Sequence, residues 1–215
     1  MSRVTGRAVY WDLDGTLTDP KKGITESIQH ALRELDLPVP HVDDLTWCIG
    51  PALLWSFERL GAPDPQAALD HYRAVYTTKG LYDCTLYDGI LDALAEIGAG
   101  RDQHIATAKP HAYARKITAH YGIAPHMRHE FGPELDGTRN DKGELLAHAL
   151  GITGDDPARS VMVGDRHYDL KAAREVGMKF IAVGWGYGGA DDLSGADAFV
   201  ERPGELAMTV RDLVG

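Results

Sequence analysis

Short apolar runs alternate along this chain with segments in which apolar residues recur every three to four positions. Five runs are typical of buried strands, and they span residues 7–12, 103–107, 160–163, 179–183 and 198–200. Helical patterns lie between or after these runs, at residues 88–97, 110–121, 142–150, 168–176 and 205–214, and glycine follows several of them. This alternation predicts an α/β fold in which helices cover the faces of a parallel sheet.

One long stretch departs from this alternation, because between residues 23 and 79 the pattern is only helical. Thr107, at the end of the second strand-like run, stands 95 positions after Asp12, at the end of the first. A crossover between parallel strands needs only about a dozen residues. We therefore expect a small all-helical domain inserted after the first strand, over residues 18–81. The predicted core then consists of residues 1–17 and 82–215.

Composition and charge narrow the class of protein. The 215 residues are 44% hydrophobic and 25% charged, which is ordinary for a folded globular chain. The net charge of −10 disfavours polymeric nucleic acid and anionic membranes as partners, because its field repels phosphate. No apolar run is long enough for a membrane span or a secretory leader, so we expect a cytoplasmic protein. Nothing in the pattern predicts an oligomeric state.

The cysteines and histidines give no metal-binding pattern. Cys48 and Cys84 lack the spacing of a metal site, and we expect both to be free thiols. His126 and His129 stand three positions apart without a metalloprotease motif, and we expect them in loops or on the surface.

Acidic and hydroxyl side chains stand where the predicted strands end. Asp12 and Asp14 follow the first strand, Thr107 ends the second and Asp165 follows the third. Because the carboxyl ends of parallel strands meet at one edge, we expect these side chains around one crevice. Clustered carboxylates repel one another unless a cation compensates them. Oxygen ligands without Cys or His favour Mg²⁺, which binds through carboxylates, water and substrate phosphate.

Other groups at the same edge suit a phosphate. Lys142, at the start of a predicted helix, adds a positive charge, and Thr107 adds a hydroxyl donor. Backbone N–H groups in the turn after Thr107, beginning with Ala108, can cradle phosphate oxygens. Asp12 and Asp14 are separated by one residue, so in an extended chain both side chains point to one face. One carboxylate can then attack phosphorus while the other transfers the proton.

These segments resemble the four motifs of the haloacid dehalogenase superfamily, in the same order and over nearly the whole chain. They are Asp12-Leu13-Asp14-Gly15-Thr16-Leu17, Ile105-Ala106-Thr107, Lys142, and Val161-Met162-Val163-Gly164-Asp165 with Asp169. The resemblance implies a Rossmann-like three-layer core and identifies the helical insertion as an α-helical cap.

The resemblance also implies a role for each motif residue. Asp12 would be the nucleophile and Asp14 the general acid and base. Mg²⁺ would bind the Asp12 side chain, the Asp14 carbonyl and Asp165. Asp169 would support these ligands without touching the metal, or it would contact the metal itself.

Thr107, Ala108 and Lys142 would hold the phosphoryl group. Many members of the superfamily carry Lys-Pro-x-Pro at the third motif, whereas this chain has Lys142-Gly143. Lys109 competes for the lysine role, because it follows Thr107 closely. We favour Lys142, which comes after the next predicted segment, where the superfamily places its lysine.

Within the superfamily, the chain resembles the phosphoglycolate phosphatase-like group most. The segments that carry this resemblance include 23–28, 49–51, 86–89, 164–166 and 184–188. We therefore predict a Mg²⁺-dependent phosphatase that hydrolyses a small phosphorylated metabolite, a phosphate monoester, through an aspartyl-phosphate.

Several alternatives stay open. A 5′-nucleotidase acting on nucleoside monophosphates comes first, followed by a hexose-phosphate mutase. A phosphonatase would need a cap lysine, for which Lys21, Lys22 and Lys79 are candidates. A binding protein on the same fold is the alternative outside enzymes, and the presence of every motif residue disfavours it.

For the aromatic residues, we favour a role in packing over a role in substrate binding. Trp185 and Tyr187 lie in a glycine-rich loop, where they could stack on a nucleotide base, but we expect them to pack against a neighbouring loop. We expect Trp47, Trp55 and Phe57 to lie in the core of the helical domain.

Overall fold

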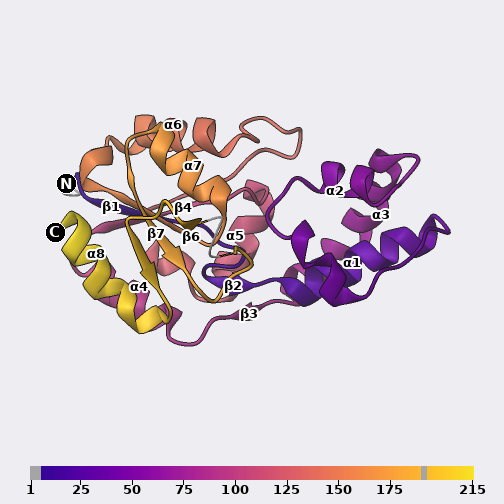
Figure 1. Ribbon diagram of the computed structural model, residues 1–215, viewed down its shortest axis with the longest axis horizontal. Helices are drawn as coiled ribbons and strands as arrows, with labels where there is room; N and C mark the ends of the chain where they lie inside the picture. Colours follow the sequence, from indigo (N-terminus) through magenta and orange to yellow (C-terminus); the bar gives the residue numbers. More distant parts are fainter. Residues whose placement is uncertain (1–5, 190–192) are drawn as a thin grey trace. The chain divides into compact units, whose positions relative to one another are not determined.

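The computed structural model describes residues 6–189 and 193–215 and confirms the predicted α/β fold with its parallel sheet (Figure 1). Residues 1–5, which the predicted core includes, lie outside the described ranges. The chain divides into two compact units. The first consists of residues 1–17 and 86–215, and the second of residues 18–85.

The first unit is built around a six-stranded sheet with the order β5-β4-β1-β6-β7-β8, in which each adjacent pair is parallel. The strands are β1 (Ala8–Trp11), β4 (Asp102–Ala106), β5 (His129–Phe131), β6 (Val161–Gly164), β7 (Lys179–Val183) and β8 (Ala198–Val200). Of the two expectations for His129, a loop or the surface, the loop was wrong, and the residue is partly exposed. This residue lies in β5, whose three residues are too few to show an alternating pattern.

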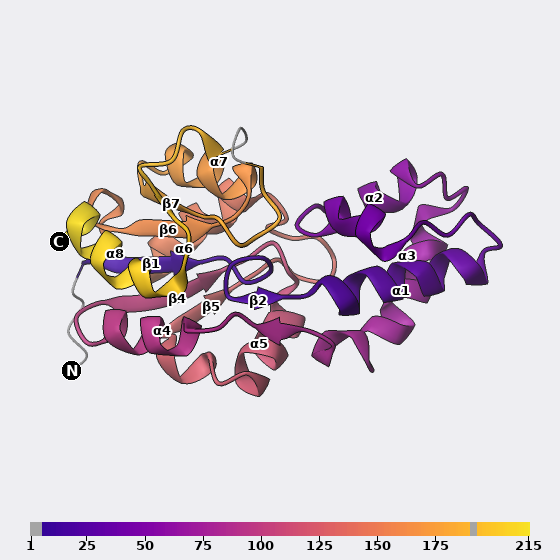
Figure 2. The same cartoon turned by 60° about the horizontal axis from the view of Figure 1, so that its bottom comes forward.

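Helices cover both faces of this sheet. Helices α6 and α7 lie on one face and α4, α5 and α8 on the other (Figures 1 and 2). Their bounds are α4 (Ile90–Gly98), α5 (His111–His120), α6 (Lys142–Thr153), α7 (His167–Glu175) and α8 (Leu206–Val214). Helix α6 continues past its predicted end at Leu150. It ends at Thr153 and is capped by Gly154, whose φ of 72° lies in the left-handed region that closes helices.

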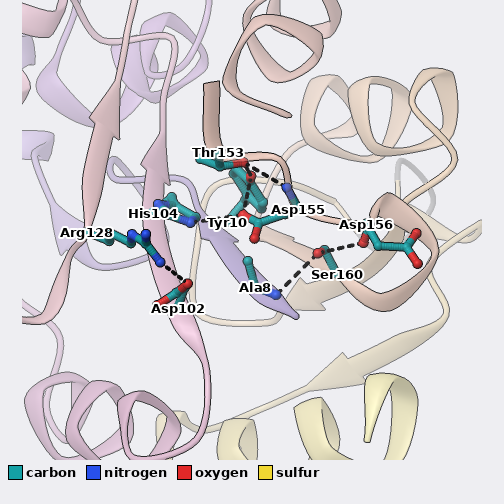
Figure 3. A network of polar contacts seen from close by, with 9 residues as sticks. All are labelled: Ala8, Tyr10, Asp102, His104, Arg128, Thr153, Asp155, Asp156 and Ser160. Atoms are coloured by element: carbon teal, nitrogen blue, oxygen red, sulfur yellow. Dashed lines mark hydrogen bonds and ion pairs between the residues drawn. The ribbon is translucent and has the colours of Figure 1, made fainter. Parts of the chain in front are cut away.

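A buried polar network lies inside the apolar core on the α6 and α7 side (Figure 3). The Tyr10 hydroxyl donates a hydrogen bond of 2.9 Å to Asp155 Oδ2, and His104 Nε2 lies 3.1 Å from the same oxygen. Tyr10 and Thr153 also share a hydrogen bond of 2.8 Å. The network ties β1 and β4 to the chain that follows α6. Burial lowers the pKa of His104 to about 4, despite the opposing effect of Asp155.

The second unit is mostly helical and consists of α1 (Lys21–Glu34), η1 (Val42–Cys48), α2 (Leu53–Arg59), α3 (Pro65–Tyr76) and η2 (Gly80–Tyr82). Helix α1 packs against α3, and its buried residues include Ile24, Ile28 and Leu32. The Asp64 side chain caps α3 by accepting hydrogen bonds from the backbone N–H groups of Gln66 and Ala67.

Two details of this unit differ from the prediction. It is not all helical, because the short strands β2 (Thr18–Asp19) and β3 (Thr85–Leu86) pair at its two ends. It also extends four residues past the predicted boundary at residue 81, to Thr85. The added residues stay with the helices because the Gly23 N–H donates a 2.9 Å hydrogen bond to the Asp83 carbonyl.

The aromatic residues of the helical unit divide between interior and surface. Phe57 is fully buried, as expected, whereas Trp55 is 44% exposed, so its predicted place in the core was wrong. Trp55 packs edge-on against Trp47, and the Arg59 guanidinium lies over both rings, 4.8 Å from the Trp47 centroid. This cation–π contact holds the indole at the surface.

The remaining expectations on cysteines and membrane spans can be compared directly. Cys48 and Cys84 form no disulfide among the described residues, in agreement with the prediction of thiols. In the described part of the chain, no helix is both long enough and apolar enough to cross a membrane.

Candidate active site

The sheet register brings the carboxyl ends of three strands to one edge. Trp11 of β1 pairs with Ile105 of β4 and with Val163 of β6. The Asp12 N–H continues the ladder by donating a 2.9 Å hydrogen bond to the Val163 carbonyl. Side chains that follow these strands therefore meet at one edge, as the sequence predicted.

Asp12 and Lys142 form the first charge pair of the site. Lys142 Nζ donates a 2.8 Å hydrogen bond to Asp12 Oδ1 and also forms an ion pair with Asp169, and all three side chains are buried. Lys142 is the first residue of α6, and the Asp141 carboxylate caps that helix through the Glu144 N–H. Burial lowers the pKa of Lys142, but Asp12 and Asp169 outweigh burial and hold it above the ordinary lysine value.

Asp14 and Lys109 form a second, separate charge pair. Lys109 Nζ lies 2.6 Å from Asp14 Oδ2, and the two side chains are only 5% and 11% exposed. Burial raises the pKa of Asp14 and Lys109 opposes this effect. From the sequence, Lys109 and Lys142 were alternatives for one role. In the structure, each lysine forms an ion pair with a different carboxylate. The position of Lys109, two residues after Thr107, was the only signal for this pair.

Asp165 is held by the glycine-rich loop after β7. The Tyr187 N–H donates a 2.6 Å hydrogen bond to Asp165 Oδ2. A Cβ at Gly188 would lie 1.7 Å from the Asp165 carbonyl oxygen, so this close approach requires glycine. Asp165 Oδ1 is buried without a hydrogen-bond partner among the described residues. Burial, with the nearby charges of Asp12 and Asp169, raises the pKa of Asp165 to about 7.

Gly15 also lies close to the Asp165 carboxylate. Its φ of +86° is strained for any residue with a side chain, and a Cβ there would lie 2.3 Å from Asp165 Oδ2. This positive-φ glycine thus brings the chain after Asp14 against Asp165.

Three of these carboxylates fit a divalent cation. Asp12, Asp165 and Asp169 each place one oxygen within 4.8 Å of the other two, and all three residues are buried. The site holds four carboxylates and two ammonium groups, so buried negative charge is in excess. A bound cation would add the positive charge that offsets this excess. Mg²⁺ prefers ligand sets made up of oxygen atoms, such as this one. The unpartnered Asp165 Oδ1 fits a ligand atom of such an ion.

Asp169 is oriented by its own helix as well as by Lys142. Its Oδ2 accepts a 3.0 Å hydrogen bond from the Arg166 N–H at the start of α7. Burial raises the pKa of Asp169 above its ordinary value, against the opposing effect of Lys142. The geometry is compatible with both expectations for this residue, a support behind the ligands or a ligand itself.

Thr107 and Ala108 lie in the turn between β4 and α5. Thr107 is buried, and its Oγ1 accepts a 3.2 Å hydrogen bond from the Lys109 N–H. Ala108 is partly exposed in the same turn. These residues lie at the same edge of the sheet as Asp12. The hydrogen bond between Thr107 Oγ1 and the Lys109 N–H, which fixes the turn, was not predicted from the sequence.

Trp185 packs against the loop after β1, as expected. Its Nε1 donates a 3.0 Å hydrogen bond to the Thr16 carbonyl, and its ring meets Tyr87 edge-on. Tyr187 contributes to the site through its backbone N–H rather than its ring.

Comparison with known proteins assigns this geometry to a family. The model of haloacid dehalogenase-like hydrolases matches residues 9–183. A Pseudomonas aeruginosa protein named 5′-nucleotidase is 41% identical over 189 residues, covering 86% of each chain. The tyrosine-protein kinase PtkA of Mycobacterium tuberculosis is 38% identical over 209 residues, which cover 96% of this chain and 72% of PtkA.

A solved structure agrees in fold. The crystal structure of a predicted phosphatase from Clostridium acetobutylicum superposes with a TM-score of 0.91 at 31% identity, covering 96% of this chain and 99% of that one.

Proposed function

The chain belongs to the haloacid dehalogenase-like hydrolase family, and from this premise we propose that Asp12 and Asp14 hydrolyse a small phosphate monoester by way of a phosphorylated Asp12. Phosphatase activity itself follows from the family and its phosphatase-named relatives. The observation that carries the proposal is the pairing of two neighbouring carboxylates with two different lysines, Asp12 with Lys142 and Asp14 with Lys109. Two carboxylates with different partners can take two different roles.

In the first half-reaction, Asp12 is the nucleophile. A carboxylate oxygen of Asp12 forms a bond to phosphorus, and the bond between phosphorus and the ester oxygen breaks. The leaving oxygen keeps the bonding electrons and takes a proton from Asp14, which releases the alcohol. Lys142 lies against Asp12 and would bind the charged oxygens of the phosphoryl group together with Thr107 and the Ala108 N–H.

In the second half-reaction, water attacks the same phosphorus atom. Asp14 takes a proton from the water as the new P–O bond forms and the bond to Asp12 breaks. The products are inorganic phosphate and the free Asp12 carboxylate, so Asp14 recovers the proton that it gave up in the first step.

Phosphatases of this family generally use Mg²⁺. Asp12 and Asp165 are side chains that would hold the ion, with the Asp14 carbonyl as the further ligand that the family resemblance implies, and Asp169 would support them or contact the ion itself. When bound, Mg²⁺ supplies positive charge that polarises the phosphoryl oxygens and offsets the excess of carboxylates.

For the substrate, we favour a nucleoside 5′-monophosphate over phosphoglycolate. The 41% identical relative named 5′-nucleotidase supports this class, because it shares 86% of its length with this chain. Phosphoglycolate, which the sequence resemblance suggested, is the competing substrate. We assign the helical unit, residues 18–85, as the cap that selects between these two substrates. The cytoplasmic location stays a prediction.

A second acceptor is suggested by the relative named tyrosine-protein kinase. If a hydroxyl replaced water in the second half-reaction, the phosphoryl group would be transferred rather than released. Water is the favoured acceptor, because the relative with the higher identity is named 5′-nucleotidase.

The test measures phosphate release from nucleoside 5′-monophosphates, phosphoglycolate and sugar phosphates, with Mg²⁺ and with EDTA. Wild type is compared with Asp12→Asn, and a parallel assay follows transfer from ATP to protein tyrosine. Mg²⁺-dependent release that disappears in Asp12→Asn supports the proposal. Absence of release from every ester by folded wild type, or transfer to tyrosine without hydrolysis, contradicts it.

A further inference from the structure

Lys109 is a buried cation to which the reaction described above gives no role. Its side chain is 5% exposed, and its Nζ lies 2.6 Å from Asp14 Oδ2. Lys142 is the lysine that contacts Asp12, so Lys109 is not a second copy of the same contact. A buried ammonium is costly unless it is paired, and here its partner is the carboxylate proposed to move the proton.

The backbone fixes Lys109 from two sides. Its N–H donates a 3.2 Å hydrogen bond to Thr107 Oγ1, which forms a tight turn directly after β4. On the other side, a Cβ at Gly132 would lie 2.5 Å from the Lys109 carbonyl oxygen, so the chain after β5 passes very close. Pro110 then opens α5 at the next residue. The lysine therefore projects from a turn with little freedom.

The two oxygens of Asp14 have different surroundings. Oδ2 faces Lys109, whereas Oδ1 is buried and has no hydrogen-bond partner among the described residues. A protonated carboxyl group has one O–H donor and one carbonyl-like acceptor oxygen. Since an ammonium only donates, the oxygen beside Lys109 must be the acceptor, and the proton must sit on the other oxygen.

We propose that Lys109 is a positioning residue that holds Asp14 by Oδ2 and leaves Oδ1 as the atom that gives and takes the proton. This inference rests on the proposed function, because it assigns an atom and a partner to the general acid and base. Without Lys109, the Asp14 carboxyl rotates about its terminal bond, and its proton points at the leaving oxygen only part of the time. The phosphoryl-binding groups around Asp12 are left in place.

Leaving-group dependence tests this role. An alkoxide leaving group needs a proton as the P–O bond breaks, whereas p-nitrophenolate leaves as a stable anion. In Lys109→Met, kcat/KM for an alkyl phosphate should fall about 100-fold, the usual contribution of a positioned acid. For p-nitrophenyl phosphate, kcat/KM of the same variant should fall less than about tenfold. We use kcat/KM because it reports the steps through departure of the leaving group and omits the attack of water.

A double-mutant cycle tests whether Lys109 acts through Asp14. If it does, Lys109→Met should cost the alkyl phosphate little further activity in an Asp14→Asn background, so the two effects are not additive. Lys116→Met is the matched control, because Lys116 lies exposed on α5 and should leave kcat/KM unchanged for both substrates. Thermal unfolding of each variant shows whether it is folded at the assay temperature.

Each outcome bears on one of the two proposals. Equal losses for both substrates, additive losses in the cycle, or full activity of Lys109→Met would each overturn the positioning role while wild type stays active. If Lys109→Met does not fold, Lys109→Gln is measured in the same way. Absence of Mg²⁺-dependent release by wild type from any ester would instead contradict the proposed function.

Discussion

Lys142 Nζ lies 2.8 Å from Asp12 Oδ1 and forms an ion pair with Asp169 on its other side, in a part of the site where all three side chains are buried. One ammonium thus separates two carboxylates that would otherwise repel each other at short range. The pair joins β1 to the first residue of α6 across 130 positions of sequence. We therefore expect both stability and catalysis to depend on Lys142, and the two effects can be measured separately.

Replacing Lys142 with methionine should destabilise the fold and also lower activity. In EDTA, the free energy of unfolding should fall by about 3–5 kcal/mol, because two buried carboxylates lose their shared partner. In Mg²⁺, kcat/KM should fall at least about 100-fold, because the phosphoryl group loses a cation. Urea denaturation and steady-state kinetics measure the two effects. Lys171→Met is the control, because Lys171 forms only an exposed ion pair with Glu175 and should change neither quantity appreciably.

The loop after β7 should be intolerant of a single methyl group at one position. In Gly188→Ala, the new Cβ would collide with the Asp165 carbonyl oxygen at 1.7 Å, so Asp165 or the loop must move. We expect activity at limiting Mg²⁺ to fall at least about tenfold. At Gly189, the adjacent residue, a Cβ meets no atom of the described residues within 4 Å, so Gly189→Ala should behave as wild type. Mg²⁺ titrations of activity distinguish the two variants, and equal behaviour would contradict the assigned role of the loop.

The buried network at His104 should make stability depend on pH with a predictable sign. The pKa of His104 is about 4 in the folded chain, below the ordinary value of 6.5. As pH falls from about 6.5 towards 4, the unfolded chain binds a proton that the folded chain does not, so stability decreases. At pH 5, the loss from this residue is about 2 kcal/mol relative to pH 7.5.

The variant His104→Gln isolates this contribution from the other titrating groups. Asp165 and Asp169 have raised folded pKa values, so they stabilise the fold as pH falls and act against His104. Both act in wild type and variant alike. Between pH 7.5 and pH 5, wild type should therefore lose about 2 kcal/mol more than His104→Gln in urea denaturation. Parallel pH dependences of the two proteins would show that His104 is not the buried neutral group described above.

The order of strands and the convergence of the acidic residues could be predicted from sequence because both rest on short-range signals. A buried strand followed by Asp12 and another followed by Asp165 are visible in the residues themselves, and parallel pairing then brings their ends together. The start of α3 at Pro65 shows a signal of the same local kind, since its capping residue Asp64 precedes it directly.

Other features depend on long-range packing and could not be predicted. The pairing of Lys109 with Asp14 joins two turns 95 positions apart, and no local pattern distinguishes it from a pairing with Asp12. Tyr187 contributes a backbone N–H, which every residue but proline carries, so its identity gave no signal. The exposure of Trp55 follows from its contacts with Trp47 and Arg59, which outweigh the usual tendency of a large apolar ring to be buried.

Removal of the metal gives the last prediction and separates the roles of two carboxylates. Ligand binding to the folded state raises its stability, by about 2.7 kcal/mol when the ligand is present at 100 times its dissociation constant. Saturating Mg²⁺ should therefore raise the Tm of wild type, and EDTA should reverse the rise. In Asp165→Asn the rise should disappear, because Asp165 Oδ1, which has no hydrogen-bond partner among the described residues, is the atom that we assign as a ligand of the ion. In Asp169→Asn, the apparent Mg²⁺ affinity should fall by about 10–100-fold if the residue only supports the ligands from behind, as its contacts with Lys142 and Arg166 suggest. Complete loss of the Tm rise in Asp169→Asn would instead assign it as a ligand, and an unchanged rise in Asp165→Asn would move the metal site away from this cluster.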